Sequence, residues 1–294
     1  IFLSSGVCTG PSQTMDRMIA CIELIRNRYQ FTGYVHLKLL PGATEAHIER
    51  ALQLAHRVSV NLEAPNAERL SAIAPRKDYF QELAKPMRVA KRLIDASGGR
   101  LAPAGQTTQF VVGAAGEPDQ EILSTTARLY NELDLRRAYF SAFQPVPGTP
   151  LDGRAPTPAW REHRLYQADW LLRFYGFDVD EVLAGGNDGM LDLGVDPKLA
   201  WALKHPERFP MDINRAERDE LLRVPGLGTR SVGAILKARR LGGLRLGDVA
   251  RLTTSVAKVR PFIVTRDWRP THAIEAAGFR AQLEKPPQQG DLFG

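Results

Sequence analysis

Residues 1–143 alternate between short apolar runs and segments with helical spacing, and this alternation limits the possible fold more than any other feature. Helical patterns, with apolar residues three and four positions apart, separate runs that have the length and composition of β-strands. Five such runs occur, at residues 1–3, 34–40, 58–62, 107–112 and 138–143. Strands that alternate with helices form parallel sheets with right-handed crossovers. The sequence therefore predicts an α/β fold, either a doubly wound sheet or part of a (β/α) barrel.

In both of these folds the chemistry lies at the carboxyl ends of the strands. The carboxyl ends of the predicted strands, and the residues just after them, include polar residues and glycines: Ser4, Ser5, Gly6, Lys38, Asn61, Glu63, Gly113, Glu117 and Gln144. We expect a binding site at this edge of the sheet. Lys38 and Glu63 would either form a structural ion pair or bind a substrate, and both readings stay open. His36 lies in the middle of a strand and is expected to pack in the core.

Charge is distributed unevenly along the chain. The net charge is +6, and residues 206–294 account for all of it, with 16 Lys and Arg against 10 Asp and Glu. Residues 1–205 carry 23 of each kind and are neutral. A basic C-terminal part favours an acidic partner, most often nucleic acid. The alternative is a solvated basic face with no partner.

A second local signal lies in residues 214–240. Asn214, with Glu217 three residues later, is expected to cap a first helix, and the turn Pro225-Gly-Leu-Gly228 leads into a second. This pattern resembles the helix-hairpin-helix motif of DNA repair proteins. Its DNA-binding residues would be Gly226, Gly228, Thr229, Arg230 and Lys237. The glycines leave backbone N–H groups free to bind a phosphate, and Gly228 is a candidate for positive φ. The alternative is a helical hairpin that only packs against its neighbours.

The rest of the chain suggests how the domains are divided. One long amphipathic helix is predicted from Trp160 to Leu183. A second hairpin, with helices at 246–252 and 255–263, lacks the glycine pair and is expected to support the fold. The predicted divisions are a partial barrel at 1–158, a helix and connector at 159–205, a small all-α helix-hairpin-helix domain at 206–284, and a flexible tail at 285–294.

Three loops of the first half resemble the S-adenosylmethionine site of the radical SAM superfamily. They are Ser4-Ser-Gly6, Asn61-Leu-Glu63 and the segment 110–117, Phe-Val-Val-Gly-Ala-Ala-Gly-Glu. The resemblance implies that the first loop meets the methionine amino group, the second the ribose or carboxylate, and the third the adenine. It thus assigns cofactor-binding roles to Ser4, Ser5, Gly6, Asn61, Glu63, Gly113 and Glu117. The implied fold is a partial parallel, TIM-like (β/α) barrel.

Together with the hairpin, these loops make the chain similar to radical SAM proteins of DNA modification and repair, which are related to biotin synthase. The resemblance implies an enzyme that uses S-adenosylmethionine and a [4Fe–4S] cluster to generate a 5′-deoxyadenosyl radical and modify a nucleotide in DNA. Its partners would be DNA, an electron donor and other DNA repair proteins. The family's C-x-x-x-C-x-x-C loop is absent, because Cys8 and Cys21 lie 13 residues apart. We expect the cluster ligands upstream of Ile1, and no metal ligand or catalytic residue is assigned.

Two other functions stay open: a non-catalytic DNA-binding adaptor on a degenerate barrel, and a radical enzyme that acts on a small molecule. Two cysteines are too few for a disulfide framework, which favours a reducing compartment, and Cys8 is expected to be a small buried residue. No apolar run reaches the roughly 18 residues that a membrane span needs. No signal peptide opens the sequence. We therefore expect a cytoplasmic protein that does not associate with membranes.

Overall fold

A computed structural model describes residues 1–8 and 10–271 of the chain. They divide into two compact units, the first covering Ile1–Glu162 and the second beginning at His163. The division falls inside helix α6 (Ala159–Phe174), so most of the predicted connector 159–205 belongs to the second unit. The predicted tail 285–294 lies outside the described residues.

The first unit alternates strands and helices as the sequence predicts, and the α/β fold class is confirmed. Its strands are β1 (Phe2–Leu3), β2 (His36–Lys38), β3 (Arg57–Ser59), β4 (Gln106–Val112) and β5 (Arg137–Ala142). Its helices are α1 (Pro11–Asn27), α2 (Glu45–Leu54), α3 (Ala67–Ile73), α4 (Lys85–Ala96), α5 (Asp119–Leu133) and the start of α6, and a π-helical turn, Tyr79–Ala84, leads into α4.

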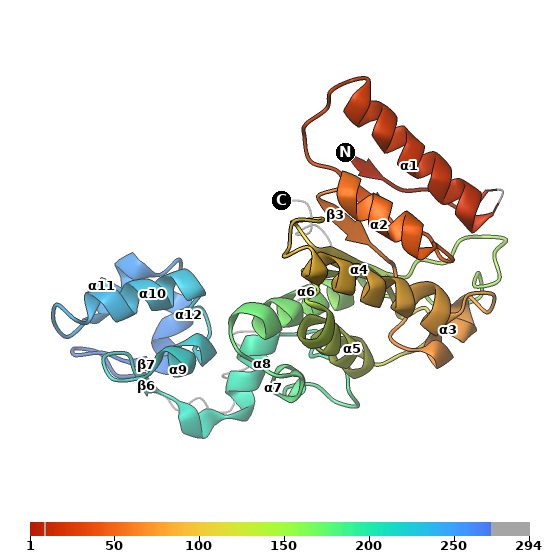
Figure 1. Cartoon of the computed structure of the whole chain (residues 1–294). Helices are drawn as coiled ribbons and strands as arrows, with labels where there is room; N and C mark the ends of the chain where they lie inside the picture. The colour runs from red at the N-terminus through yellow and green to blue at the C-terminus, as the bar shows by residue number, and fades with distance from the viewer. Residues whose placement is uncertain (9, 272–294) are drawn as a thin grey trace. The chain divides into compact units, whose positions relative to one another are not determined.

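The five strands of the first unit form one parallel sheet in the order β1-β2-β3-β4-β5. The strand order follows the chain order, whereas a doubly wound sheet reverses its order at a switch point. The doubly wound alternative is therefore excluded for this sheet. Right-handed crossovers that always advance in one direction place the connecting helices on one face. Accordingly, α1 packs against α2, α2 against α4, and α4 against α5 (Figure 1).

Alternate residues of each strand face these helices and form the core of the first unit. Leu37, Val58, Phe110 and Phe140 are all at most 2% exposed, and the rings of Phe110 and Phe140 stack with centroids 6.2 Å apart. Gln106 also faces the helices, because its side-chain amide donates to backbone carbonyls of α4 and of the end of α5. Successive side chains of a strand point to opposite faces. The residues between these positions therefore line the other face of the sheet.

The second unit is mainly helical and contains one small sheet. After α6 it comprises α7 (Val179–Leu183), α8 (Pro197–Lys204), β6 (Met211–Asp212), α9 (Arg218–Arg223), α10 (Thr229–Ala238), α11 (Leu246–Leu252), α12 (Val256–Val259) and β7 (Ile263–Val264). Short 3₁₀ turns span Pro206–Arg208 and Arg260–Phe262.

Several predictions for this unit are wrong, and two of them concern its secondary structure. The basic region is not purely α-helical, because β6 and β7 pair in parallel and bury Ile263. The predicted helix from Trp160 to Leu183 is in fact two helices, because α6 ends at Phe174 and Gly176 adopts φ +66° before α7 begins. A left-handed backbone at glycine is a common way to end a helix.

Helices α9 and α10 form the hairpin that the sequence predicts, and we call them, with the turn 224–228 between them, the glycine-turn hairpin. Leu221, Val232 and Ile235 are at most 1% exposed and hold the two helices together. The predicted cap is displaced. Glu217, and not Asn214, is the N-cap of α9, while the Asn214 side chain bonds the backbone of Leu244 instead.

Candidate functional site

The sheet face opposite the helices is lined by polar side chains, and we call it the polar sheet face. It contains a pocket of about 260 Å³ whose walls include His36, Ser59, Asn61, Thr107, Gln109 and Tyr139. These residues come from strands β2 to β5 and from the segment just after β3. Hydroxyl, amide and imidazole groups that converge on one small pocket are typical of a ligand site.

Two buried polar atoms of this pocket lack a hydrogen-bond partner among the described residues. They are the Thr107 hydroxyl oxygen, in a residue with no exposed surface, and Nε2 of His36. Burial, reinforced by the nearby Arg57 charge, lowers the pKa of His36 to about 4, so its ring is neutral at pH 7. An unpartnered buried polar group costs about 1–3 kcal/mol. The pocket therefore offers a neutral imidazole and a hydroxyl to a ligand or to water.

The structure places Asn61 in this pocket, where its amide donates to the Gln109 side chain at 3.3 Å. Glu63 continues the pairing with β4 through a bridge to Phe110 and has φ +65°. The ion pair considered between Lys38 and Glu63 does not form, because the Glu63 carboxylate instead lies 3.7 Å from the ammonium of Lys77.

The loop Ser4–Gly6 directly follows β1, which is two strands away from β3. Adjacent strands lie about 4.8 Å apart, so roughly 10 Å separate this loop from the carboxyl end of β3. Ser5 donates its hydroxyl to the Gly6 carbonyl. The loop is thus at the expected edge of the sheet, although it does not line the pocket that contains Asn61.

Gly113 and Glu117 are joined in one loop at the end of β4. Both carboxylate oxygens of Glu117 accept backbone N–H groups, one from Gly113 and one from Ala115, and Glu117 is 2% exposed. Gly113 has φ +85°, and a Cβ there would clash with the Thr157 hydroxyl. Arg161 fixes the loop from outside by donating to the Glu117 carbonyl at 2.6 Å. We therefore expect the Glu117 side chain to fix the shape of this loop, and the loop backbone to contact any ligand.

Sequence reasoning missed several residues of the pocket and misjudged others. His36 was predicted to be a packed core residue, but it lines the pocket, and Cys8 is exposed and not buried. The missed pocket residues are Phe2, Ser59, Thr107, Thr108, Gln109 and Tyr139. A signal for two of them was present, because Thr107 and Gln109 are two positions apart in a strand and must share a face.

The glycine-turn hairpin places Gly226, Gly228, Thr229 and Arg230 around the start of α10, whereas Lys237 lies in its last turn. Gly228 is the N-cap of α10 and supplies no side chain to cap the helix. The N–H groups of a first helical turn have no intrahelical partner, so this helix start is suited to binding an anion. The positive φ of the turn belongs to Gly226, at +83°, whereas Gly228 has φ −95°. The suggestion of positive φ at Gly228 is therefore wrong, because the chain reverses one step earlier.

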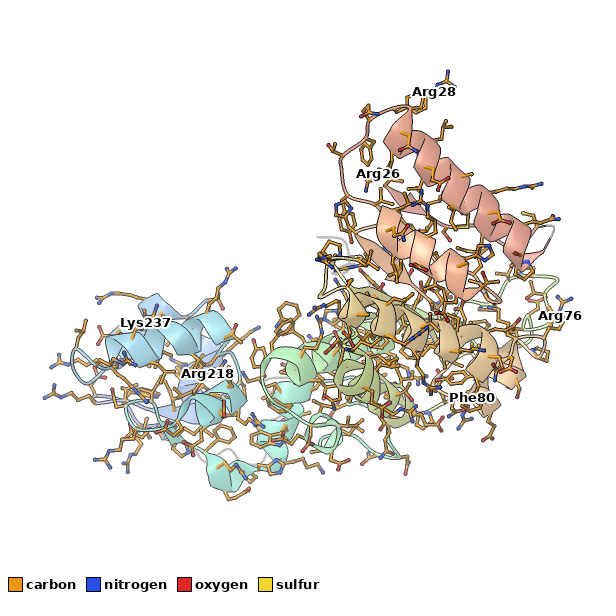
Figure 2. All side chains as sticks on the ribbon, in the orientation of Figure 1. Arg26, Arg28, Arg76, Phe80, Arg218 and Lys237 are labelled. Carbon is orange, nitrogen blue, oxygen red and sulfur yellow. The ribbon has the colours of Figure 1, made fainter. Side chains whose placement is uncertain are left out.

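Two exposed basic side chains, Arg230 and Lys258, lie near this turn, and a third, Lys237, lies in the last turn of α10. Arg230 and Lys237 on α10 and Lys258 on α12 make no ion pair within the part of the chain that the structure describes (Figure 2 labels Lys237). In contrast, Arg215, Arg218 and Arg251 each lie within 4 Å of an acidic side chain in the same unit. Lys258 is beside the turn, because a Cβ at Gly226 would lie 3.0 Å from its Cβ. Arg230 and Lys258 thus bring positive charge without internal compensation close to the glycine turn.

Comparison with protein-family models, with curated proteins and with solved structures finds no match for this chain. Among the described residues, no three His, Cys, Asp or Glu side chains are grouped so that they could hold a metal ion. Within residues 1–8 and 10–271, no helix is both long and apolar enough to cross a membrane.

Proposed function

We propose that this chain binds DNA through the glycine-turn hairpin and S-adenosylmethionine on the polar sheet face, as part of a radical SAM enzyme that modifies or repairs a nucleotide. The observation that carries the proposal is the uncapped start of α10, with the exposed and unpaired side chains of Arg230 and Lys258 beside it. Lys237 extends the basic surface to the last turn of the same helix. Backbone N–H groups at a helix start together with nearby cations bind phosphates without reading base identity.

The groups on the polar sheet face complement those of S-adenosylmethionine, and the 260 Å³ pocket would hold one part of that molecule. This molecule has hydroxyl, amino, carboxylate and adenine groups, and the pocket offers amides from Asn61 and Gln109 together with the unpartnered atoms of His36 and Thr107. A neutral His36 avoids repulsion of the sulfonium charge. In the proposed site these side chains would bind and orient the molecule. The surrounding fold would be a partial (β/α) barrel, with its helices on the opposite face of the sheet.

The residues described here do not fit a [4Fe–4S] cluster, since three thiolates are needed and the chain has only Cys8 and Cys21. When bound to such a cluster, S-adenosylmethionine supplies a 5′-deoxyadenosyl radical in the radical SAM family. No step of that chemistry is assigned to the described residues. The proposal for this chain concerns the binding of S-adenosylmethionine and of DNA.

Fluorescence anisotropy with a labelled DNA duplex at several salt concentrations tests the DNA part. Each neutralised phosphate contributes about −0.9 to the slope of log K against log salt. Replacing Arg230 or Lys237 by alanine should weaken binding several-fold for every sequence and reduce the slope by about one.

Arg76→Ala is the matched control, because Arg76 is an exposed arginine of the first unit with no ion pair in the described part of the chain (Figure 2). This variant should bind duplex DNA like the unmodified protein. Binding that does not depend on salt, or an equal effect of Arg76→Ala and Arg230→Ala, would exclude the hairpin as the DNA interface.

A further inference from the structure

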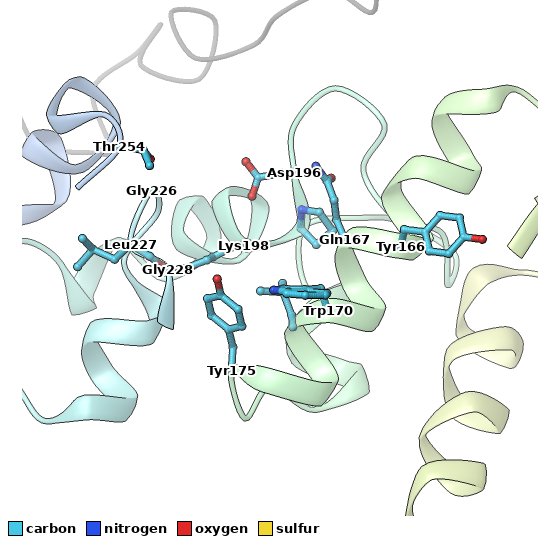
Figure 3. Close-up of a pocket in the computed structure, with 12 residues that line it drawn as sticks. Tyr166, Gln167, Trp170, Tyr175, Asp196, Lys198, Gly226, Leu227, Gly228 and Thr254 are labelled. Atoms are coloured by element: carbon cyan, nitrogen blue, oxygen red, sulfur yellow. Dashed lines mark hydrogen bonds between the residues drawn. The ribbon is translucent and has the colours of Figure 1, made fainter. Parts of the chain in front are cut away.

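A second pocket lies inside the second unit, directly beside the glycine turn. Its volume is about 460 Å³, which is enough for a nucleobase with its sugar. One wall consists of the backbone from Gly226 to Gly228 together with Thr254, and the opposite wall contains the aromatic rings of Trp170 and Tyr175 (Figure 3). The proposed phosphate site and this aromatic pocket therefore share the same three residues.

Trp170 is the most exposed ring in the pocket wall, with 53% of its surface accessible. Its ring packs against Phe174 on the same helix, with centroids 4.5 Å apart, and the guanidinium of Arg173 lies 5.6 Å from its centroid. These contacts hold the indole in place while leaving much of it exposed. A fixed and exposed indole is a platform on which a flat ring can stack.

Lys198 supports the turn from within the same pocket. Its ammonium is buried, donates to the Leu227 carbonyl at 2.6 Å, and lies 4.7 Å from the centroid of the Tyr175 ring. The Tyr175 hydroxyl points toward Lys198 and Gly228 (Figure 3). Lys198 thus connects the glycine turn to the wall of the pocket. A ligand in the pocket and a phosphate at the start of α10 would therefore contact the same rigid structure.

A carboxylate in the pocket wall disfavours an anionic ligand there. Asp196 lines the pocket, and its carboxylate would repel an anion while accepting hydrogen bonds from N–H groups. An anion is instead favoured outside the pocket, at the start of α10 near Arg230 and Lys258. A ligand with a flat, uncharged, N–H-bearing ring attached to a phosphate satisfies both regions.

We propose that this pocket holds one unpaired nucleobase of a DNA strand, stacked on Trp170, while an adjacent phosphate binds at the start of α10. The inference rests on the proposed function, because it assumes that the glycine turn binds DNA phosphates. It adds that the protein prefers DNA in which a base is already out of the helix, since a paired and stacked base cannot reach the pocket without being flipped. Stacking on an aromatic ring tolerates any base.

Fluorescence anisotropy with three otherwise identical duplexes tests this preference. One is fully paired, one has a single bulged thymidine, and one has an abasic nucleotide at the bulge. The full chain should bind the bulged thymidine roughly tenfold more tightly than the paired duplex, a difference of about 1.4 kcal/mol. The abasic bulge, which is equally flexible but lacks the base, should show little of this gain.

Variants then connect the preference to the pocket. Trp170→Ala should lose the gain for the bulged thymidine and keep the affinity for the paired duplex, while Trp170→Phe should keep most of both. Leu241→Ala serves as the control, because Leu241 is 94% exposed in the same unit and does not line the pocket.

Equal affinity for the paired and bulged duplexes, or an equal gain for the abasic bulge, would overturn the nucleobase pocket and leave the DNA proposal standing. Retention of the full gain in Trp170→Ala would also overturn it. Failure of the proposed function gives a different result, namely no salt-dependent binding to any of the three duplexes.

Discussion

Replacing Gly226 by alanine should destabilise the second unit far more than the same change at Gly228, two positions later. Gly226 has φ +83°, and a Cβ there would lie 2.9 Å from Cγ2 of Val259 and 3.0 Å from Cβ of Lys258. A side chain in the left-handed region costs about 1–2 kcal/mol and overpacking about 1–3 kcal/mol. The expected loss in the free energy of unfolding is therefore about 2–5 kcal/mol.

Gly228 has an ordinary backbone conformation, with φ −95°, and among the described residues a Cβ there would meet only the Tyr175 hydroxyl, at 3.5 Å. Alanine is a poorer N-cap than glycine, so a small loss of below about 1 kcal/mol is expected for Gly228→Ala. The two variants differ in position by only two residues and carry the same added methyl group. They therefore isolate the effect of backbone conformation and local packing.

Urea unfolding followed by tryptophan fluorescence measures the difference, because three of the four tryptophans, Trp170, Trp201 and Trp268, belong to the second unit. With a slope near 2 kcal/mol per molar urea, a loss of about 3 kcal/mol lowers the midpoint by about 1.5 M. Gly226→Ala should show such a shift and Gly228→Ala less than a third of it. Equal midpoints for the two variants, or a lower midpoint for Gly228→Ala, would refute the reasoning.

Three further predictions concern the pockets. The folded protein should lose stability as the pH falls from about 6.5 to 4, because His36 takes up a proton in the unfolded chain but not in the folded one, where its pKa is about 4. Urea titrations at several pH values should show a smaller loss for His36→Phe. Burial lowers the pKa of Lys198 to about 7. The free energy of unfolding should therefore rise between pH 7 and 10, by at most about 1.4 kcal/mol per pH unit. Lys198→Met should reduce this slope in the same titration. By calorimetry, Asn61→Ala and Gln109→Ala should each weaken S-adenosylmethionine binding by about 1–3 kcal/mol, whereas Glu63→Ala should weaken it less.

The sequence predicts the local elements of this protein well, because they follow from patterns within short windows. The five strands and the helices between them appear where the periodicity of apolar residues places them. The hairpin around Gly226 and Gly228 also follows from neighbouring residues. Glycine, proline and capping side chains act on the backbone next to them, so their effects can be recognised without the fold.

Contacts between distant segments could not be predicted in this way. The Thr107 hydroxyl and the His36 imidazole share one pocket only because β3 lies between β2 and β4. The ammonium of Lys198 reaches the Leu227 carbonyl across 29 positions of the chain. The close approach of Val259 and Lys258 to Gly226 also joins segments that are distant along the chain. Burial, desolvation and steric clashes arise from residues that are distant along the chain. The tertiary structure alone therefore decided which polar groups lack partners, and where a ligand could form hydrogen bonds with them.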